Sequence, residues 1–287
     1  MDKAKSNLAA SFKDRLLRLA KAQGQPFDVI LVRYGLERLL YRLSISTYRN
    51  RFILKGGLLV TLWVDDAMRV TRDVDFLGHG DDNPDRLLET FAEIFAIDGH
   101  DGLIFDAEAL TAEAIREDAD YGGTRLKTVA LLEKTRISIT IDIGFGDAVA
   151  PPAMDIDFPN LLDGQASRIQ AYPPAAVIAE KFQAMVHLGL INGRMKDYYD
   201  LWAIPQSLAI EPNCLDAAIE ATFKRRGTAV PTETPPGLSE AFYTSADKRR
   251  QWDAYARSIE FDGPPFPDIV RAIWALVGPA CRRLNNP

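Results

Sequence analysis

The sequence predicts an α+β fold, in which a first half with a mixed sheet and helices is followed by a second half made of helices. Residues 136–144 alternate isoleucine with polar or small residues, which is the period of a half-buried strand. Apolar residues recur at helical spacing in residues 6–48 and again after Pro174. Prolines punctuate the connection between the halves, so we predict two domains, residues 1–150 and 151–287.

The first half is expected to begin with two helices in residues 6–48, because Gly24 and Pro26 interrupt an otherwise helical pattern. On the second helix, the charged side chains that we expect to face water are Arg33, Glu37, Arg38 and Arg42. The elements that follow are a strand at 51–55, a helix at 58–64, a strand at 70–77, a helix at 84–95 and a strand at 125–133 that partners the alternating one.

The second half is expected to be helical after an irregular connection. Residues 151–173 contain several prolines and predict a loop-rich segment. From Pro174 onward the pattern is helical, with breaks at Asn192-Gly193 and across residues 231–237.

Composition and charge exclude several classes of protein. The 287 residues are 47% hydrophobic and 26% charged, which is typical of a globular protein and excludes a disordered chain. A net charge of −6 excludes binding of nucleic acid through overall charge, so contacts with phosphates require local basic clusters. The clusters that could make such contacts, or simply face solvent, are residues 224–226, 248–250 and 282–283.

The cysteine content and the N-terminus predict the cellular compartment. Two cysteines, Cys214 and Cys281, are too few for a disulfide framework or a four-cysteine zinc site. The first residues are charged and lack the apolar core of a signal peptide. No stretch approaches the roughly 18 apolar residues that a membrane helix needs. We therefore expect a cytoplasmic protein without a membrane partner.

Three acids stand on the predicted strands. Asp73 and Asp75 are two residues apart, so both side chains point to one face of a strand while Val74 points to the other. Two carboxylates at roughly 7 Å repel each other unless a cation lies between them, and Mg²⁺ binds carboxylates together with substrate phosphates. Asp142 lies on the polar face of the alternating strand and would converge on the pair if the two strands are neighbours. For the Asp-x-Asp pair taken alone, a solvated strand end is the alternative.

A double glycine, Gly56-Gly57, lies between a predicted strand and a predicted helix. Phosphates approach backbone N–H groups closely where side chains are absent. Taken alone, the double glycine is equally consistent with a plain turn. Together with the three acids, it favours a site that binds a metal ion and phosphates.

A second group of charged residues lies on the predicted helices of the second half. Lys181 lies within a helix, where a lysine either extends to solvent or meets an anion. Asp197 and Asp200 share one face of the next helix, and a short turn should let Asp200 face Lys181. Two alternatives are equal at this point. The two acids take part directly in catalysis, or they form a structural network of salt bridges with Arg194, Lys196 or Lys181.

These residues stand in motifs that resemble a known family. The motifs are Lys55-Gly56-Gly57, Arg69-Val-Thr-Arg-Asp73-Val-Asp75-Phe76, Ile141-Asp142-Ile143-Gly144-Phe145-Gly146-Asp147, Tyr172-Pro173, Ala179-Glu180-Lys181-Phe182 and Arg194-Met-Lys-Asp197-Tyr-Tyr-Asp200-Leu-Trp202. In this order, and over nearly the whole chain, they are similar to the AbiEii/AbiGii toxin family of nucleotidyltransferases, a branch of the polymerase-β-like superfamily. The resemblance implies a polymerase-β-like nucleotidyltransferase core, whose active site the helical domain completes.

Carried over by position, the resemblance implies roles for individual residues. Asp73 and Asp75 would hold the metal, Mg²⁺ or Mn²⁺, and Asp142 matches the third acid of the superfamily. Asp197 and Asp200 would belong to the catalytic helical motif together with Lys181. The residues that would contact the nucleotide are Gly56, Gly57, Thr71, Lys181 and Arg194. Gly57 stands where the superfamily usually has a serine, so no serine hydroxyl is expected to hold the triphosphate.

The resemblance also implies a substrate, an acceptor and a biological role. The leading hypothesis is a toxin of a bacterial toxin–antitoxin or abortive-infection system, which transfers a nucleotide from an NTP to RNA, first of all the 3′ end of tRNA, and so blocks translation. A cognate antitoxin would be its protein partner. The alternatives are a protein that binds an NTP without transferring it, a nucleotidyltransferase that modifies a protein, and a degenerate scaffold that binds an antitoxin.

Overall fold

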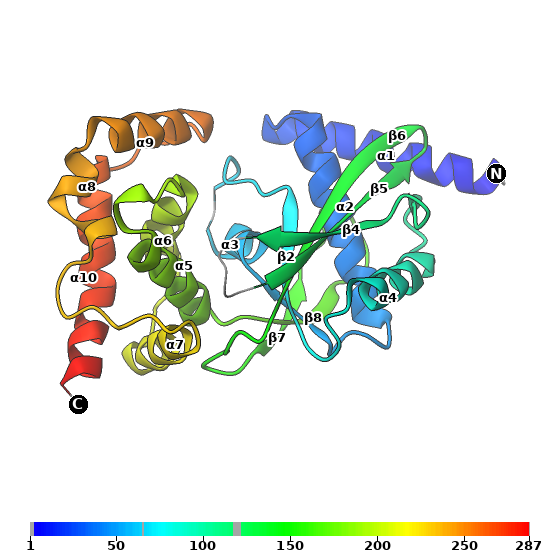
Figure 1. Ribbon diagram of the computed structural model, residues 1–287. Helices are drawn as coiled ribbons and strands as arrows, with labels where there is room; N and C mark the ends of the chain where they lie inside the picture. The colour runs from blue at the N-terminus through cyan, green and yellow to red at the C-terminus, as the bar shows by residue number, and fades with distance from the viewer. Residues whose placement is uncertain (1–2, 65, 117–121, 287) are drawn as a thin grey trace. The chain divides into compact units, whose positions relative to one another are not determined.

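The computed structural model describes residues 3–64, 66–116 and 122–286. Within these residues, one mixed sheet of eight strands has the order β3-β5-β6-β2-β1-β8-β7, with β4 also paired to β5. β5 and β6 form a long antiparallel hairpin (Figure 1), whereas β2 runs parallel to β6 and β8 runs parallel to β1. The strands are β1 (Phe52–Lys55), β2 (Asp73–Gly78), β3 (Leu103–Phe105), β4 (Thr111–Arg116), β5 (Gly122–Leu132), β6 (Thr135–Phe145), β7 (Met154–Phe158) and β8 (Ser167–Ala171).

Helices stand before, between and after the strands. They are α1 (Lys3–Gln23), α2 (Phe27–Ile45), α3 (Gly57–Trp63), α4 (Pro84–Ala96), α5 (Pro174–Leu188), α6 (Met195–Ser207), α7 (Pro212–Arg225), α8 (Glu240–Thr244), α9 (Ala246–Ser258) and α10 (Phe266–Asn285), with short 3₁₀ turns at Gly189–Ile191 and Pro236–Leu238. The predicted α+β class is confirmed, including the helical second half. In the described parts of the chain, no helix is long and apolar enough to cross a membrane.

The alternation in β6 sorts its side chains between the two faces of the sheet. Ile139, Ile141 and Ile143 are at most 1% exposed. The helix α2 packs against β6 and β8, which closes a core over the apolar face. Thr140 and Asp142 alternate with these isoleucines, so they lie on the opposite, polar face of the sheet.

Three of the four charged α2 side chains that were expected to face water are buried, and the fourth, Arg33, is half-buried. Glu37, Arg38 and Arg42 are only 2%, 6% and 1% exposed. Arg38 and Arg42 both form ion pairs with Asp101, at 2.6 and 2.7 Å, and Glu37 accepts a 2.6 Å hydrogen bond from the N–H of Leu161. The expectation was wrong because these partners come from distant loops, which the periodicity of a helix does not reveal.

The connection expected to be loop-rich carries two strands. β7 and β8 pair antiparallel, and β8 joins the sheet beside β1, where Leu54 and Ala171 are in register. The strands β3 and β4, on the far side of β5, were not predicted either. Strands of three to six residues contain little of the period-two signal, and the prolines around residues 151–173 obscured it further.

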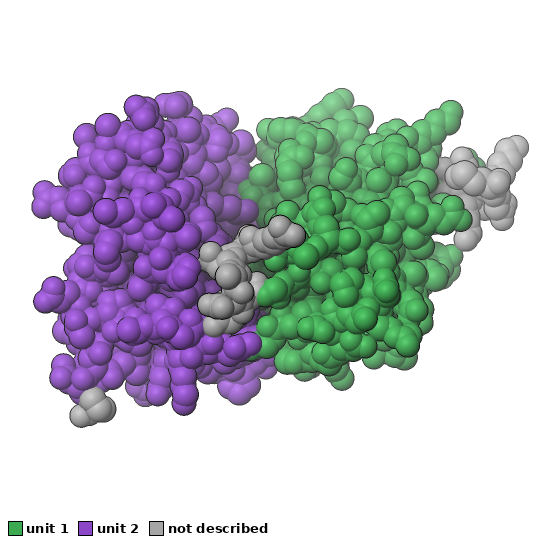
Figure 2. Space-filling view, viewed as in Figure 1, with its two compact units in different colours: residues 1–59, 70–146, 154–171 green, residues 60–69, 147–153, 172–287 purple. Residues whose placement is uncertain are grey.

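The contacts divide the chain into two compact units, which Figure 2 shows in different colours. Unit 1 comprises residues 1–59, 70–146 and 154–171 and contains the sheet with α1, α2 and α4. Unit 2 comprises residues 60–69, 147–153 and 172–287 and contains the helices from α5 onward. The domain boundary at residue 150 remains a prediction.

Aromatic side chains from four helices form the core of unit 2. Tyr198 of α6 and Phe242 of α8 stack with ring centroids 5.2 Å apart, and Trp252 of α9 and Phe266 of α10 stack at 4.8 Å. All four residues are at most 4% exposed. Stacked aromatic rings bury large areas, so this cluster holds α6, which carries Asp197 and Asp200, in place.

Candidate active site

Asp73 and Asp75 lie at the beginning of β2, on the polar face of the sheet. Val74 and Phe76 alternate with them and are fully buried in the core. Thr71 Oγ1 donates a hydrogen bond of 2.5 Å to Asp73 Oδ1. The structure therefore brings together Thr71 and the two acids, as the resemblance implies.

The turn at Gly56 and Gly57 lies directly against Asp75. Gly56 has a φ of +70°, and a Cβ at this position would overlap the Asp75 carboxylate. The N–H of Gly57 donates a hydrogen bond of 3.3 Å to Asp75 Oδ2. Glycine is thus required at residue 56 both for the backbone conformation and for the close approach to the acid.

A row of charged residues crosses the polar face of the sheet. The strand registers place Asp75 beside Lys55 on one side and beside Asp142 on the other. Asp142 is in turn paired with Arg125 of β5. The strand of Asp142 and the strand of the acid pair are neighbours, because β2 pairs in parallel with β6; this is the condition under which Asp142 was expected to converge on the pair.

The surroundings of Asp75 disfavour its charged form. Burial is the main cause that raises the pKa of Asp75 to about 6, and the charges of Asp73 and Asp142 raise it further. The charge of Lys55 and the N–H of Gly57 act in the opposite direction. A cation beside Asp75 would favour its ionised form, so the arrangement suits the binding of a positive ion.

The donor atoms at this place fit Mg²⁺, which prefers carboxylate oxygens and takes the rest of its ligands from water and substrate phosphates. Asp73 and Asp75 supply such oxygens. Both oxygens of Asp142, in contrast, accept hydrogen bonds from Arg125. Within residues 3–64, 66–116 and 122–286, no three acidic, histidine or cysteine side chains gather closely enough to hold a metal ion. The residues therefore fit a metal held by two carboxylates, and the metal role of Asp142 stays a prediction.

A second charged group is buried in unit 2, between α5 and α6. Lys181 Nζ lies 2.9 Å from Asp200 Oδ2 and also pairs with Asp197. Arg194 Nε lies 2.7 Å from Asp197 Oδ2. Asp200 is fully buried and Asp197 is 4% exposed. The prediction that Lys181 and Asp200 face each other is confirmed, and the acids form the network of salt bridges that was one of the two alternatives.

Arg69 belongs to the same network, although sequence reasoning gave it no role. Its Nε and Nη2 donate hydrogen bonds of 2.7 Å to the two oxygens of Asp200, and its side chain is 1% exposed. The two residues are 131 positions apart, so no local spacing could reveal the pair. The only signal was an arginine four residues before Asp73 in the motif.

The network keeps its members ionised. Burial would raise the pKa of Asp200, but the charges and hydrogen bonds of Lys181 and Arg69 hold this pKa below its usual value. Burial would lower the pKa of Lys181, but Asp197 and Asp200 raise it well above its usual value. Each acid of this group is thus paired with cations inside the protein. A catalytic role for Lys181, Asp197 and Asp200, and a nucleotide contact by Lys181 and Arg194, remain predictions.

In each basic cluster named as a candidate contact for RNA, at least one positively charged side chain is bonded to other residues of the protein. Arg226 lies 3.2 Å from Glu180 and 3.4 Å from Asp147. Lys248, 7% exposed, donates a hydrogen bond of 2.8 Å to the carbonyl of Asn192. Arg283 lies 2.6 Å from Asp216. This internal pairing leaves less positive charge for phosphates than the sequence clusters suggest.

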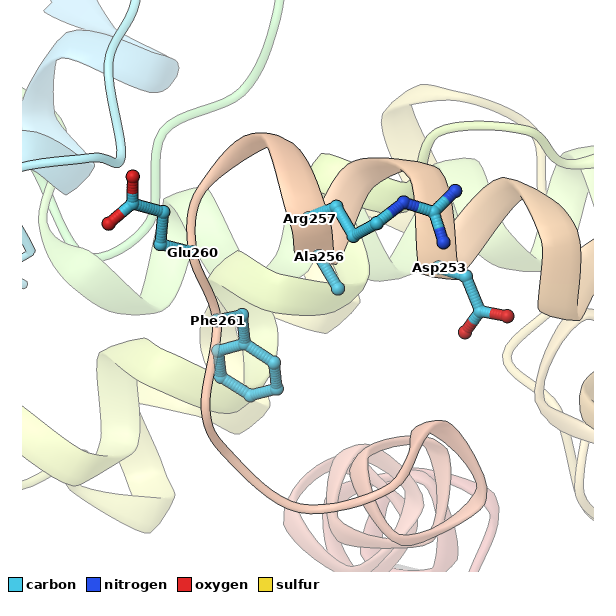
Figure 3. Close-up of a pocket in the computed structure, with 5 residues that line it drawn as sticks. All are labelled: Asp253, Ala256, Arg257, Glu260 and Phe261. Atoms are coloured by element: carbon cyan, nitrogen blue, oxygen red, sulfur yellow. The ribbon is translucent and has the colours of Figure 1, made fainter.

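A shallow hollow lies at the end of α9 and is lined by residues that come later in the chain than those of the charged network. Figure 3 shows Asp253, Ala256 and Arg257 along the helix, and Glu260 and Phe261 beyond its end. The side chains that line it include one arginine, two carboxylates and one aromatic ring, and none of the residues predicted for the site.

A comparison with protein families identifies the same family that the motifs resemble. A family profile described as "Nucleotidyl transferase AbiEii toxin, Type IV TA system" matches residues 38–276. The comparison with curated proteins gives no match.

Two solved structures from Helicobacter pylori are similar to the chain. One is a protein whose assignment as a nucleotidyltransferase is itself provisional; it has 13% sequence identity, covers 88% of this chain and 96% of its own, and has a TM-score of 0.38. The other, JHP933, has 13% identity, covers 87% of this chain and 93% of its own, and has a TM-score of 0.35.

Proposed function

We propose Mg²⁺-dependent nucleotide transfer to RNA for this chain, which belongs to the AbiEii nucleotidyltransferase toxins of type IV toxin–antitoxin systems. The nucleotide comes from an NTP, and the acceptor is an RNA 3′-hydroxyl, with the 3′ end of tRNA as the first candidate. Attack of this hydroxyl on the α-phosphate forms a new phosphodiester bond and releases pyrophosphate. A tRNA blocked at its 3′ end cannot be aminoacylated, so translation stops.

The observation that carries the proposal is the acid pair on β2. Asp73 and Asp75 share one face of the strand and stand beside a turn, Gly56-Gly57, that has no side chains. Burial, followed by the charge of Asp73, raises the pKa of Asp75 to about 6, so a bound cation would favour the ionised form of Asp75. The chemistry that Mg²⁺ supplies when bound there is the polarisation of the phosphates and the neutralisation of the leaving pyrophosphate.

Hydrogen bonds from neighbouring residues orient the two acids. Thr71 fixes one oxygen of Asp73 by its hydrogen bond, and the Gly57 N–H fixes one oxygen of Asp75. The absent side chain at Gly56 lets the Asp75 carboxylate lie directly against the turn. Such positioning and electrostatic stabilisation make up most of the catalysis in phosphoryl-type transfers.

The test is transfer of a labelled nucleotide to RNA. The wild-type protein, Asp73→Asn and Asp75→Asn are incubated with each of the four α-labelled ribonucleoside triphosphates, Mg²⁺ and total tRNA. We expect label on tRNA with the wild type and a loss of at least a hundredfold with either variant, since each removes a carboxylate of the site. Label on tRNA that persists in both variants would contradict the proposed site.

The rival functions are separate outcomes of the same assay. Label on a polypeptide in a cell extract would make a protein the acceptor. Binding of an NTP without label on RNA or protein would favour sequestration of the nucleotide. Expression in growing cells adds the biological readout: the wild type should arrest growth, and co-expression of a cognate antitoxin, which the type IV family implies, should relieve the arrest.

A further inference from the structure

The polar face of the sheet carries a row of charged residues on neighbouring strands. From β1 to β4 the registers place Lys55, Asp75, Asp142, Arg125 and Glu113 side by side. Neighbouring strands are about 4.8 Å apart, so all five side chains belong to one continuous surface. A cation therefore stands on each side of the two central acids, Lys55 next to Asp75 and Arg125 next to Asp142.

Arg125 and Asp142 form a bidentate ion pair. Arg125 Nε donates to Asp142 Oδ1 at 2.7 Å, and Nη2 donates to Asp142 Oδ2 at 2.6 Å. Both carboxylate oxygens are thus used by one guanidinium group. This geometry holds the guanidinium in a fixed plane on the sheet, because two parallel hydrogen bonds remove its rotational freedom.

The guanidinium keeps unused donors. Its Nη1 makes no hydrogen bond to any residue that the structure describes, and the Arg125 side chain is 34% exposed. The Asp142 side chain beneath it is 15% exposed. The negative charge of Asp73 also acts on Arg125, which places the guanidinium near the acid pair. A cation with free N–H groups therefore stands at the edge of the proposed metal site.

Asp142 differs from the other two acids of this surface. Asp73 and Asp75 accept hydrogen bonds from a threonine hydroxyl and a backbone N–H, which are neutral donors. Asp142 is the acid that an arginine neutralises. A carboxylate that already accepts two charge-assisted hydrogen bonds gains little from a metal ion, whereas Asp73 and Asp75 gain much.

We propose that Arg125 binds the phosphates of the incoming NTP and that Asp142 is the positioning residue that holds its guanidinium, rather than a metal ligand. The inference rests on the proposed function, because it assigns a contact in the same nucleotide site. The planar fork of an arginine matches phosphate oxygens, and the three N–H groups not engaged by Asp142, two on Nη1 and one on Nη2, can reach them. Lys55, at the other end of the row, brackets the acids with a second positive charge.

The experiment compares nucleotide binding and metal binding in a set of variants. The variants are Arg125→Gln, Arg125→Lys, Asp142→Asn, the double variant Arg125→Gln/Asp142→Asn, and Lys127→Gln. Lys127 is the matched control, since it lies two residues from Arg125 on the same face of β5 and pairs with Glu113 at 2.5 Å. Circular dichroism and thermal unfolding identify any variant that does not fold.

Nucleotide affinity is measured with non-hydrolysable α,β-methylene analogues of the four ribonucleoside triphosphates in the presence of Mg²⁺. We expect Arg125→Gln to raise the Kd about tenfold to a hundredfold, as loss of a charge-assisted hydrogen bond does. Asp142→Asn should raise it less, Arg125→Lys should restore it partly, and the double variant should be no worse than Arg125→Gln alone. Lys127→Gln should change it by less than about twofold.

Metal affinity is measured by titration of the nucleotide-free protein with Mn²⁺, followed by the electron paramagnetic resonance signal of the free ion. Asp142→Asn should bind Mn²⁺ like the wild type, while Asp75→Asn should bind it much more weakly. A loss of Mn²⁺ affinity in Asp142→Asn equal to that in Asp75→Asn would overturn the positioning role. A folded Arg125→Gln with unchanged nucleotide affinity would overturn the phosphate contact.

Failure of the inference is distinct from failure of the proposed function. A wild type that binds the analogues but labels no RNA contradicts the transfer to RNA, while the role of Arg125 is still read from the Kd values. A wild type that labels RNA, with Arg125→Gln unchanged, contradicts only the inference. A wild type that binds none of the analogues contradicts both.

Discussion

The charged group around Asp200 in unit 2 and the one around Asp75 in unit 1 shift the pKa of their acids in opposite directions. In unit 2, Asp200 is fully buried and is met by Lys181 and Arg69, so its pKa falls below the usual value. In unit 1, burial and the charges of Asp73 and Asp142 raise the pKa of Asp75 to about 6, against the charge of Lys55 and the N–H of Gly57. The first group is complete within the protein. The second group carries surplus negative charge, which is the property expected of a site that awaits a cation.

The largest expected effect is a loss of stability when the charged group of unit 2, around Asp200, is broken. Asp200→Ala removes the buried carboxylate that both Arg69 and Lys181 contact, which costs about 3–5 kcal/mol of unfolding free energy. Urea unfolding of the purified variant measures the loss. Asp268→Ala is the matched control, because it removes the acid of an exposed i,i+3 pair with Arg271 and should change stability little. Equal stability of wild type and Asp200→Ala would show that the network is not a structural one.

Unit 1 contains a second acid with a raised pKa, Glu37, which is buried and forms no ion pair with the residues that the structure describes. Burial raises its pKa to about 7, against the N–H of Leu161 and the charges of Arg38 and Arg33. The folded protein therefore binds this proton more tightly than the unfolded chain, and the stability that Glu37 contributes is lost as the pH rises from about 4.5 to about 7.

Glu37→Gln is expected to remove this pH dependence. Glutamine can still accept the hydrogen bond from Leu161, so the variant should exceed the wild type at pH 8 by up to about 3 kcal/mol and match it near pH 4.5. Urea unfolding at several pH values checks the difference. A difference between the two proteins that stays constant over this range would mean that Glu37 does not titrate there.

A smaller effect is expected at the turn beside Asp75. Gly56→Ala places a Cβ in the space of the Asp75 carboxylate and in a left-handed backbone conformation, which costs about 2–3 kcal/mol. Gly80→Ala isolates the contact, because Gly80 also has a positive φ, +86°, but a Cβ there meets no atom within 4 Å. Its cost should be about 1 kcal/mol. If both substitutions cost the same, the close approach of Gly56 to Asp75 is unimportant.

The smallest expected effect is a shift of the thermal unfolding midpoint on addition of Mg²⁺, which we expect to depend on the acid pair of unit 1. Addition of Mg²⁺ should raise the thermal unfolding midpoint of the wild type by a few degrees, because the ion binds only the folded state. Asp75→Asn should abolish this shift. Asp268→Ala, whose acid lies far from the pair in sequence and on the surface, should retain it. A shift that survives in Asp75→Asn would place the metal elsewhere.

The helices and the long hairpin were readable from the sequence, because their signals are local. The isoleucine alternation of β6 and the break at Gly24 and Pro26 each act within a few residues. The spacing of Asp73 and Asp75 also determined that both lie on one face of a strand. In contrast, β7 and β8 were missed, since short strands between prolines show little periodicity.

What the sequence alone determined about this protein is therefore the pattern within each element: the α+β class, the paired acids on one strand, and Lys181 opposite Asp200 across a short turn. Only the tertiary structure decided which elements meet. It paired β2 with β6, so that Asp142 stands beside Asp75, and it brought Arg69 to Asp200 across 131 positions. The physical reason is that side-chain direction follows from the local backbone period, whereas ion pairing and burial depend on contacts between segments that are distant in the chain.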